Sequence, residues 1–183
     1  MKKGKFIIIS GPSRVGKDTI CDKLVKKGIG RYSVSMTTRK KRANEIDGIS
    51  YFFVTKEKFE KYIKEDCFLE YAMYNGNYYG TPKKFIKDTT DNGDNVLAIL
   101  EIKGAINAKK IFSNAITIFI MPPSFDELER RLRDRKSEDD NSINERLNIA
   151  KEEIKCKDKY DYVVINNTVD ETVLEIENII NNY

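Results

Sequence analysis

The sequence contains no histidine, and this absence excludes a whole group of mechanisms. Without an imidazole, the chain has no histidine general base, nucleophile or metal ligand. Cysteine is also scarce, with three residues in the chain. They are odd in number, far apart and in no metal-ligand spacing. We therefore expect Cys21, Cys67 and Cys156 to be reduced, buried thiols.

Long hydrophobic runs are missing as well. No apolar run approaches the about 20 residues that a membrane-spanning helix needs. The run "FIII" near the start is too short for the core of a signal peptide, and no small-residue cleavage site follows it. We expect a cytoplasmic protein without a membrane partner.

Charge of one sign is only slightly in excess. The net charge of +4 is compatible with a small anionic substrate, and it falls short of the basic stripe expected of a nucleic-acid-binding protein. We therefore expect no nucleic-acid partner. With 34% charged and 40% hydrophobic residues, the 183-residue chain has the composition of one globular domain.

Apolar runs alternate with helical patterns along most of the chain. The runs are "KFIIIS" after the N-terminus, "NVLAIL" at 95–100, "AITIFIM" at 115–121 and "DYVVIN" at 161–166. Helical spacing follows at 18–27, 104–112, 124–135, 142–155 and 169–180. Continuous apolar runs are typical of parallel strands covered on both faces. The alternation predicts an α/β fold with a doubly wound parallel sheet.

Two segments interrupt this alternation. Residues 33–79 offer four short β-rich runs, "SVSMTT", "ISYFFVT", "FLEYAMY" and "NYYGT", with one helical insert, "KEKFEKYIKED". They predict an inserted, partly antiparallel lobe that faces the glycine loop described next. The polar stretch "RKSEDDNS" at 135–142 predicts a mobile tip between two helices.

The stretch "GPSRVGK" matches the phosphate-binding signature G-x-x-x-x-G-K at Gly11, Gly16 and Lys17. The glycines let backbone N–H groups turn onto phosphate oxygens, and the N-terminus of the following helix adds a favourable dipole. A lysine at this place bridges the terminal phosphates and offsets charge during transfer. An apolar strand enters the loop and an amphipathic helix leaves it, so we expect a nucleotide triphosphate here.

Asp18 departs from that signature, in which a serine or threonine hydroxyl binds Mg²⁺. A carboxylate beside a triphosphate is repelled unless a cation lies between them. Asp18 either ligates magnesium directly, or points away as a favourable anion in the first helical turn, or weakens nucleotide binding. Thr19 keeps a hydroxyl nearby, one residue further on. The sequence leaves the three interpretations open.

A second cluster suggests an anion clamp. "SMTTRKKR" supplies Arg39 and Arg42, "DGISYFF" supplies Tyr51, and "GNYYGTP" supplies Tyr79. Guanidinium groups bind phosphate through paired N–H donors, and a phenol adds an uncharged donor. The simpler interpretation of "RKKR" is an exposed basic turn.

Several motifs together resemble those of guanylate kinases, in the same order and spacing. They are "ISGPSRVGK", "SVSMTTRKKR", "DGISYFFV", "FLEYAMYNGNYYGTP", "MPPSFDELERRLRDR" and "SINERL", and they span nearly the whole chain. The resemblance implies the P-loop nucleoside-monophosphate-kinase fold with a parallel sheet core, a mixed-β GMP-binding lobe and a helical lid. It implies transfer of the γ-phosphoryl group of ATP to GMP, giving ADP and GDP, with Mg²⁺ as cofactor. The implied segments are a core at 1–32, 95–123 and 159–183, a lobe at about 33–94, and a lid at about 124–158.

The resemblance also implies roles for individual residues. The implied catalytic residues, which stabilise the charge on the transferring phosphoryl group, are Lys17, Arg135 and Arg146. The implied ATP-binding residues are Gly11, Pro12, Ser13, Arg14, Val15, Gly16, Lys17, Asp18, Thr19 and Asn166. Asp18 departs from the family here, and its direct ligation of magnesium is one of the three interpretations given above. GMP binding falls to Ser35, Arg39, Arg42, Tyr51, Glu70, Tyr79, Thr81 and Glu101.

The absent histidine fits this chemistry. The acceptor is a phosphate that is already ionised at neutral pH, so catalysis needs alignment and positive charge rather than a general base. The chain departs from the family at Arg14, where glycine is frequent, and at Ile99, where the first of two acidic residues is often found; Glu101 keeps the second.

Two alternatives remain, and the oligomeric state is undecided. A related enzyme could phosphorylate another nucleoside monophosphate or a phosphorylated sugar. A non-catalytic guanylate-kinase-like module could bind phosphopeptides instead, although such modules typically lose the lysine at the place of Lys17.

Overall fold

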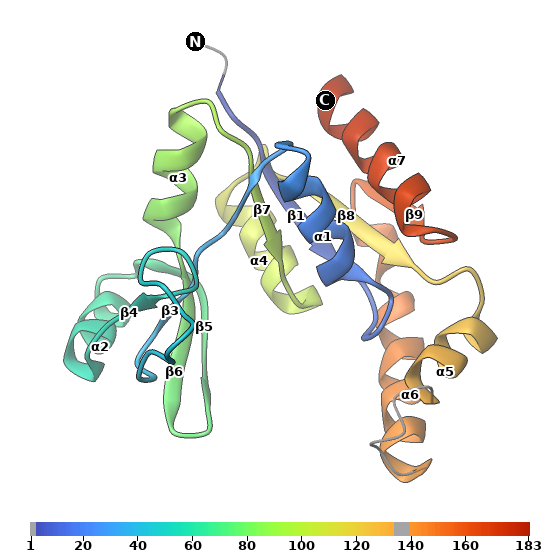
Figure 1. Cartoon of the computed structure of the whole chain (residues 1–183), viewed down its shortest axis with the longest axis horizontal. Coiled ribbons are helices and arrows are strands. Elements are labelled where there is room, and N and C mark those ends of the chain that lie inside the picture. The colour runs from blue at the N-terminus through green and yellow to red at the C-terminus, as the bar shows by residue number, and fades with distance from the viewer. Residues whose placement is uncertain (1–2, 134–139) are drawn as a thin grey trace.

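A parallel sheet forms the centre of the protein (Figure 1). The computed structural model describes residues 3–133 and 140–183. In these ranges the central sheet has five strands, in the order β2-β7-β1-β8-β9, and neighbouring strands are parallel. The strands are β1 (Phe6–Ser10), β2 (Arg31–Tyr32), β7 (Val96–Ile99), β8 (Ile116–Met121) and β9 (Tyr162–Ile165). The predicted α/β class is confirmed.

Helices cover both faces of this sheet because the side chains of each strand alternate between the two faces. In β1, Ile7 and Ile9 pack with α1 and α7, whereas Phe6 and Ile8 pack with α3 and α4. The bounds are α1 (Lys17–Lys26), α3 (Lys83–Asp91), α4 (Ile102–Ile111) and α7 (Val169–Asn182). The predicted doubly wound arrangement follows from these two apolar layers.

The strand β9 departs from the expectation of cover on both faces. It is an edge strand, and while Val164 is buried against the α7 side, Val163 and Ile165 are 42% and 52% exposed. The apolar run at 161–166 therefore predicted the strand correctly, but the prediction that both faces of this strand are buried is wrong. The sequence does not show which strand lies at the edge of the sheet.

A second, mixed sheet forms the predicted lobe, with the strand order β4-β3-β6-β5. Its elements are β3 (Met36–Thr37), β4 (Phe52–Phe53), α2 (Lys56–Lys64), β5 (Phe68–Tyr74) and β6 (Asn77–Pro82). Phe59 of α2 is fully buried and stacks on Phe68 at 4.3 Å and on Tyr78 at 5.1 Å between ring centroids. The aromatic-rich stretch thus forms a small core of its own.

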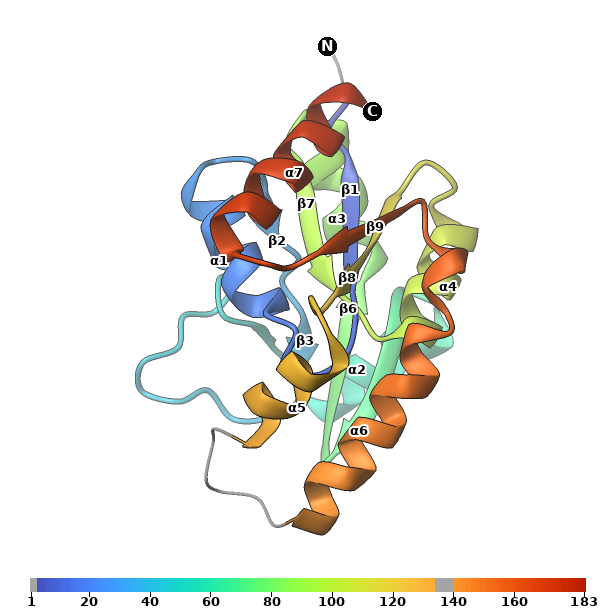
Figure 2. The same ribbon diagram turned by 90° about the vertical axis from the view of Figure 1, so that its right-hand side faces the viewer.

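Two further helices, α5 (Phe125–Arg133) and α6 (Asp140–Ile154), form the predicted lid (Figure 2). They pack through a separate apolar cluster of Leu128, Leu132, Ile143, Leu147 and Ala150. The predicted tip at 135–142 falls largely outside the described residues. A short 3-10 turn, η1 (Lys157–Lys159), then leads to β9.

The three cysteines are free thiols. Cys21 is buried as expected, but Cys67 and Cys156 are only half-buried, so the prediction of burial is wrong for these two. No helix in the described part of the chain is long and apolar enough to cross a membrane.

Candidate active site

The glycine loop lies between the end of β1 and the start of α1. Gly11 and Gly16 have φ angles of +144° and +101°, which favour glycine. A Cβ at Gly11 would also lie 2.3 Å from the carbonyl oxygen of Ile120, so this position has no room for a side chain. Arg14, where the family often has glycine, adopts a φ of 68°, a strained conformation for a non-glycine residue.

Lys17 lies folded over this loop. Its Nζ donates to the carbonyl oxygens of Gly11 and Pro12, at 2.7 and 2.8 Å. Burial lowers the pKa of Lys17, while the carboxylates of Glu153 and Asp18 act in the opposite direction. An anionic phosphate in the loop would offset this desolvation of the ammonium group.

A cavity of about 580 Å³ opens over the loop. Its lining residues are Ser13, Arg14, Gly16, Lys17, Asp18, Thr19, Arg131 and Arg146. Arg146, from the lid helix α6, donates to the Ser13 hydroxyl at 3.4 Å, so a lid side chain reaches the loop. Arg131 of α5 also donates to Glu127 at 2.8 Å. Arg135, predicted to act beside Arg146, lies outside the described residues.

Asn166 lies beneath the loop rather than in this cavity. It is only 2% exposed, its Nδ2 donates to the carbonyl of Val15 at 2.8 Å, and its Oδ1 accepts from Thr172 at 3.0 Å. The side chain therefore supports the loop from the end of β9. Its predicted contact with ATP stays a prediction.

A second cavity of about 280 Å³ lies between the lobe and the core. It brings together Ser35, Glu70, Tyr79, Thr81 and Glu101 from the predicted acceptor set, with Tyr71, Ala72, Gly80 and Ile99. Glu70 lies at a register shift in β5, opposite Thr81 on β6. Such a bulge changes the direction of a side chain. Burial, and then the charge of Glu101, raise the pKa of Glu70, and a hydrogen bond from Thr81 partly opposes this.

The predicted anion clamp is only partly assembled. Tyr51 and Tyr79 lie in edge-to-face contact at 6.1 Å, and the Arg39 guanidinium lies 5.6 Å from the Tyr51 ring centre. The backbone N–H of Arg42 contributes to a local hydrogen bond, but its side chain is exposed on the loop between β3 and β4.

Glu45 contacts both arginines of the predicted clamp, and the sequence patterns did not indicate it. Its carboxylate accepts two hydrogen bonds from Arg39, at 2.6 and 3.0 Å, and one from the backbone N–H of Arg42, at 2.8 Å. The bond from Arg39 is the largest cause that lowers the pKa of Glu45, to about 2. The available signal was an acidic residue three positions after the basic run "RKKR".

Glu101 lines the acceptor cavity, and its charge also acts on Lys17 of the loop cavity. It follows β7, the strand beside β1, so it lies at the same sheet edge as the phosphate loop. It lines the acceptor cavity, and its charge acts on both Lys17 and Glu70. Glu153 of α6 is a half-buried carboxylate whose charge also acts on Lys17, and nothing in the sequence pattern singled it out.

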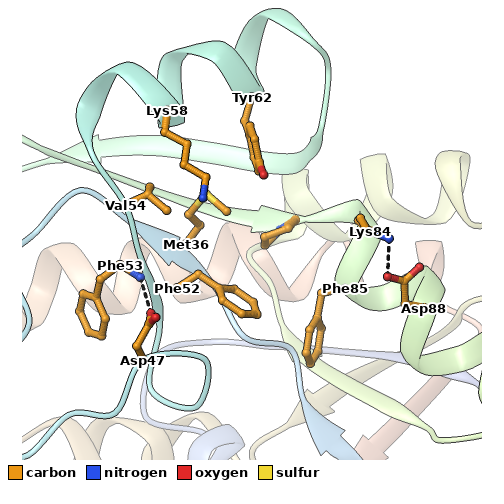
Figure 3. Close-up of a pocket in the computed structure, with 11 residues that line it drawn as sticks. Met36, Asp47, Phe52, Phe53, Val54, Lys58, Tyr62, Lys84, Phe85 and Asp88 are labelled. Carbon is orange, nitrogen blue, oxygen red and sulfur yellow. Dashed lines mark hydrogen bonds and ion pairs between the residues drawn. The ribbon is translucent and has the colours of Figure 1, made fainter.

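A third cavity, of about 340 Å³, is separate from these groups (Figure 3). It lies against α2 and α3, and Met36, Phe52, Phe85 and Tyr62 give it a largely apolar wall. Met36 alternates along its strand with Ser35, so it faces away from the acceptor cavity. None of the sequence-predicted site residues lines this third cavity.

The fold and the loop together define a class. A glycine loop between β1 and α1 of a five-stranded parallel sheet, with a mixed-sheet lobe and a helical lid on either side, is the architecture of a P-loop kinase. The family model described as guanylate kinase matches residues 3–183.

Individual proteins agree with that match. The guanylate kinase of Clostridium acetobutylicum is 47% identical over 98% of this chain and 86% of its own length. That of Oceanobacillus iheyensis is 44% identical over 98% and 87%. The crystal structure of guanylate kinase from Anaplasma phagocytophilum has a TM-score of 0.72 at 33% identity, over 100% of this chain and 87% of that one. The chain belongs to the guanylate kinase family.

Proposed function

We propose that the chain transfers the γ-phosphoryl group of ATP to the phosphate of GMP, giving ADP and GDP. One observation carries this proposal most directly: the loop cavity and the acceptor cavity lie at one edge of the parallel sheet, with Glu101 acting on groups in both. A donor site and an acceptor site at the same ends of the strands would allow one phosphoryl group to pass directly between bound nucleotides.

The donor side binds ATP through the loop backbone and Lys17. Arg146 already contacts the loop, so it is suited to stabilise the charge that spreads over the transferring group. Arg135 is proposed for the same role. No residue is needed to remove a proton, because the acceptor phosphate is ionised.

The acceptor side distinguishes guanine from adenine through Glu70. A carboxylate accepts hydrogen bonds from both N1–H and the exocyclic amine of guanine. Adenine presents a lone pair at N1, so the same carboxylate would lose its partner, and a buried unpaired group discriminates strongly. Ser35 and Thr81 line the same cavity, and Arg39, Arg42, Tyr51 and Tyr79 are proposed to bind the GMP phosphate.

Mg²⁺ is the proposed cofactor. It usually binds through one or two carboxylates, substrate phosphates and water, so an exposed Asp18 in the loop cavity is a sufficient protein ligand. No group of three metal-ligating side chains was found among the described residues, which agrees with a metal that arrives with ATP. The ion would neutralise phosphate charge during transfer.

We predict that Asp18→Asn raises the magnesium concentration needed for half-maximal rate several-fold. It should also tighten ATP binding in the absence of magnesium, because the repulsion between carboxylate and phosphate is removed. Magnesium titrations of the rate, with calorimetry of metal-free ATP, measure both effects. Asp22→Asn, one turn further along α1, is the matched control. An unchanged magnesium requirement in Asp18→Asn would contradict the assignment.

A coupled assay tests the proposed function itself. GMP, AMP, UMP and CMP are supplied separately with ATP and magnesium, and the nucleoside diphosphate formed is measured. We expect a clear preference for GMP. A preference for AMP would overturn the role of Glu70, and GMP binding without turnover would favour a phosphate-binding module.

A further inference from the structure

The helix α4 carries a glycine in its first turn, and the helix itself does not require it. Gly104 is the third residue of α4 and is buried. Its φ angle is not in the positive range, so its conformation is open to any residue. Glycine within a helix is less favourable than alanine, because it loses more backbone freedom on folding. Another feature must account for glycine here.

The space that a side chain would need is occupied by Glu70. A Cβ at Gly104 would lie 2.1 Å from Oε2 and 3.2 Å from Cδ of Glu70. The next neighbour, Cβ of Leu100, is 3.7 Å away, an ordinary contact distance. The carboxylate is thus the one group among these neighbours that conflicts with a side chain at residue 104.

The Glu70 side chain, which lies against Gly104, also lines the acceptor cavity. Glu70 lines that cavity together with Thr81 and Glu101, and β5 packs directly on α4. The bulge in β5 directs the side chain toward the helix. The carboxylate also lies beside the first turn of α4, where the helix dipole favours an anion.

We propose that Gly104 is a specificity-determining positioning residue of the acceptor site. Because glycine has no side chain, the Glu70 carboxylate can lie against the helix at this point. Gly104 thereby sets the position from which this carboxylate accepts hydrogen bonds from the two N–H groups of guanine. This inference rests on the proposed function, because it concerns recognition of the GMP base.

A side chain at residue 104 would disturb recognition of the GMP base without disturbing the fold. Oε2 is the far end of a flexible side chain, so a Cβ at residue 104 would move the carboxylate and leave the backbone in place. The helix would meanwhile gain from alanine. A change at residue 104 should therefore affect GMP and leave ATP binding and the fold intact.

Gly104→Ala tests this with steady-state kinetics for both substrates and thermal unfolding. We expect the KM for GMP to rise about 10- to 100-fold, the effect of losing a hydrogen bond to a charged group. The KM for ATP and the melting temperature should not worsen. The preference for GMP over IMP, which lacks the 2-amino group, should fall. Asn107→Ala, an exposed change one turn along α4, is the control for helix propensity and should leave all of these values near wild type.

A double variant tests whether Gly104 acts through Glu70. Aspartate is one methylene shorter than glutamate and leaves the place of Oε2 empty. Adding Gly104→Ala to Glu70→Asp should therefore raise the KM for GMP far less than adding it to the wild type.

Three results would overturn the inference, and they differ from one another. Unchanged GMP kinetics in Gly104→Ala would show that Gly104 has no positioning role, while the proposed function stands. Equal losses for ATP, GMP and thermal stability would show a packing role alone. A wild-type protein that does not phosphorylate GMP would overturn the proposed function, and this inference with it.

Discussion

The guanidinium of Arg39, which is proposed to bind the GMP phosphate, is held in place by the carboxylate of Glu45. Glu45 accepts both N–H groups of one edge of the guanidinium, and both side chains are only 17% exposed. Such bidentate pairs fix the plane of an arginine. A third N–H group donates to the carbonyl oxygen of Lys40 at 2.7 Å. The other N–H groups of Arg39 can then be directed toward a ligand without a further loss of side-chain freedom.

We predict that Glu45→Gln raises the KM for GMP about 10-fold, because an amide cannot accept all three hydrogen bonds and leaves Arg39 unrestrained. The KM for ATP should stay unchanged. Initial rates at varied GMP and at varied ATP measure the two values. Glu65→Gln, which removes only a distant exposed contact with Lys61 at 3.8 Å, is the control. Equal effects on both substrates would contradict a local role.

The pH dependence of GMP binding follows from Glu70. Its pKa is raised by burial and by Glu101, so this carboxyl takes up a proton at a higher pH than an ordinary glutamate. In the proposed function the ionised form accepts the guanine N–H groups, and this form is lost as pH falls through the raised pKa. We predict that the KM for GMP increases on acidification at a pH above the ordinary glutamate range. In Glu70→Gln this increase should be absent. A wild-type KM that is flat down to the ordinary range would contradict the assignment.

At the scale of single residues, sequence patterns predicted the loop glycines and the charged site residues. They did not predict the neighbouring residues that determine where those charged side chains lie. The loop glycines and Lys17 follow from a local signature, because their spacing is fixed by the geometry of one turn. Glu45 meets Arg39 only because the loop between β3 and β4 turns back on itself, and Glu153 and Gly104 come near Lys17 and Glu70 only in the folded chain. Nothing in the letters around Gly104 shows that residue 70 lies against it.

At the scale of elements, the lobe depends on one small core. Phe59 is fully buried between two aromatic rings, and its neighbours Phe68 and Tyr78 belong to the strands that flank the acceptor cavity. The strands β5 and β6 are therefore aligned by a helix that itself contributes no residue to that cavity.

We predict that Phe59→Ala lowers the unfolding free energy by about 3–5 kcal/mol, the usual cost of removing a buried aromatic side chain. GMP binding should weaken strongly while ATP binding persists, because the loop belongs to the other apolar layers. Chemical denaturation and calorimetry with each nucleotide measure these effects. Phe59→Leu, which keeps most of the volume, should lie between the variant and the wild type. Equal loss of ATP binding would contradict a separate lobe core.

Most strands and helices of the core could be predicted, because each is a continuous apolar run or a clear helical repeat. The helix α3 was missed, since it starts directly after Pro82 of β6 without an intervening loop. Its Ile86 packs in the core layer with Phe6 and Val96 rather than in the lobe. The exposure of β9 was also unpredictable, since strand order decides it.

At the scale of the whole molecule, the buried apolar residues form the core layers, a lobe cluster and a lid cluster, and Val15 of the phosphate loop belongs to a core layer. The core layers, the lobe cluster and the lid cluster are separate sets of buried residues. Separate packing allows the lobe and the lid to move relative to the core, and closure around nucleotides would exclude water from the transfer. The segment boundaries at 33–94 and 124–158 stay predictions, and α3 contacts both units, with Ile86 in a core layer and Phe85 in edge-to-face contact with Phe52 of the lobe.

In the proposed function, the two cavities hold donor and acceptor face to face. A crystal structure with adenosine and guanosine joined through five phosphates, which mimics both nucleotides at once, tests it most directly. The account predicts one molecule per chain, with phosphates along the loop at Lys17, the far phosphates near Arg39, and guanine hydrogen-bonded to Glu70. Binding of the guanosine half outside the Glu70 cavity, or of the two halves to unconnected surfaces, would contradict it.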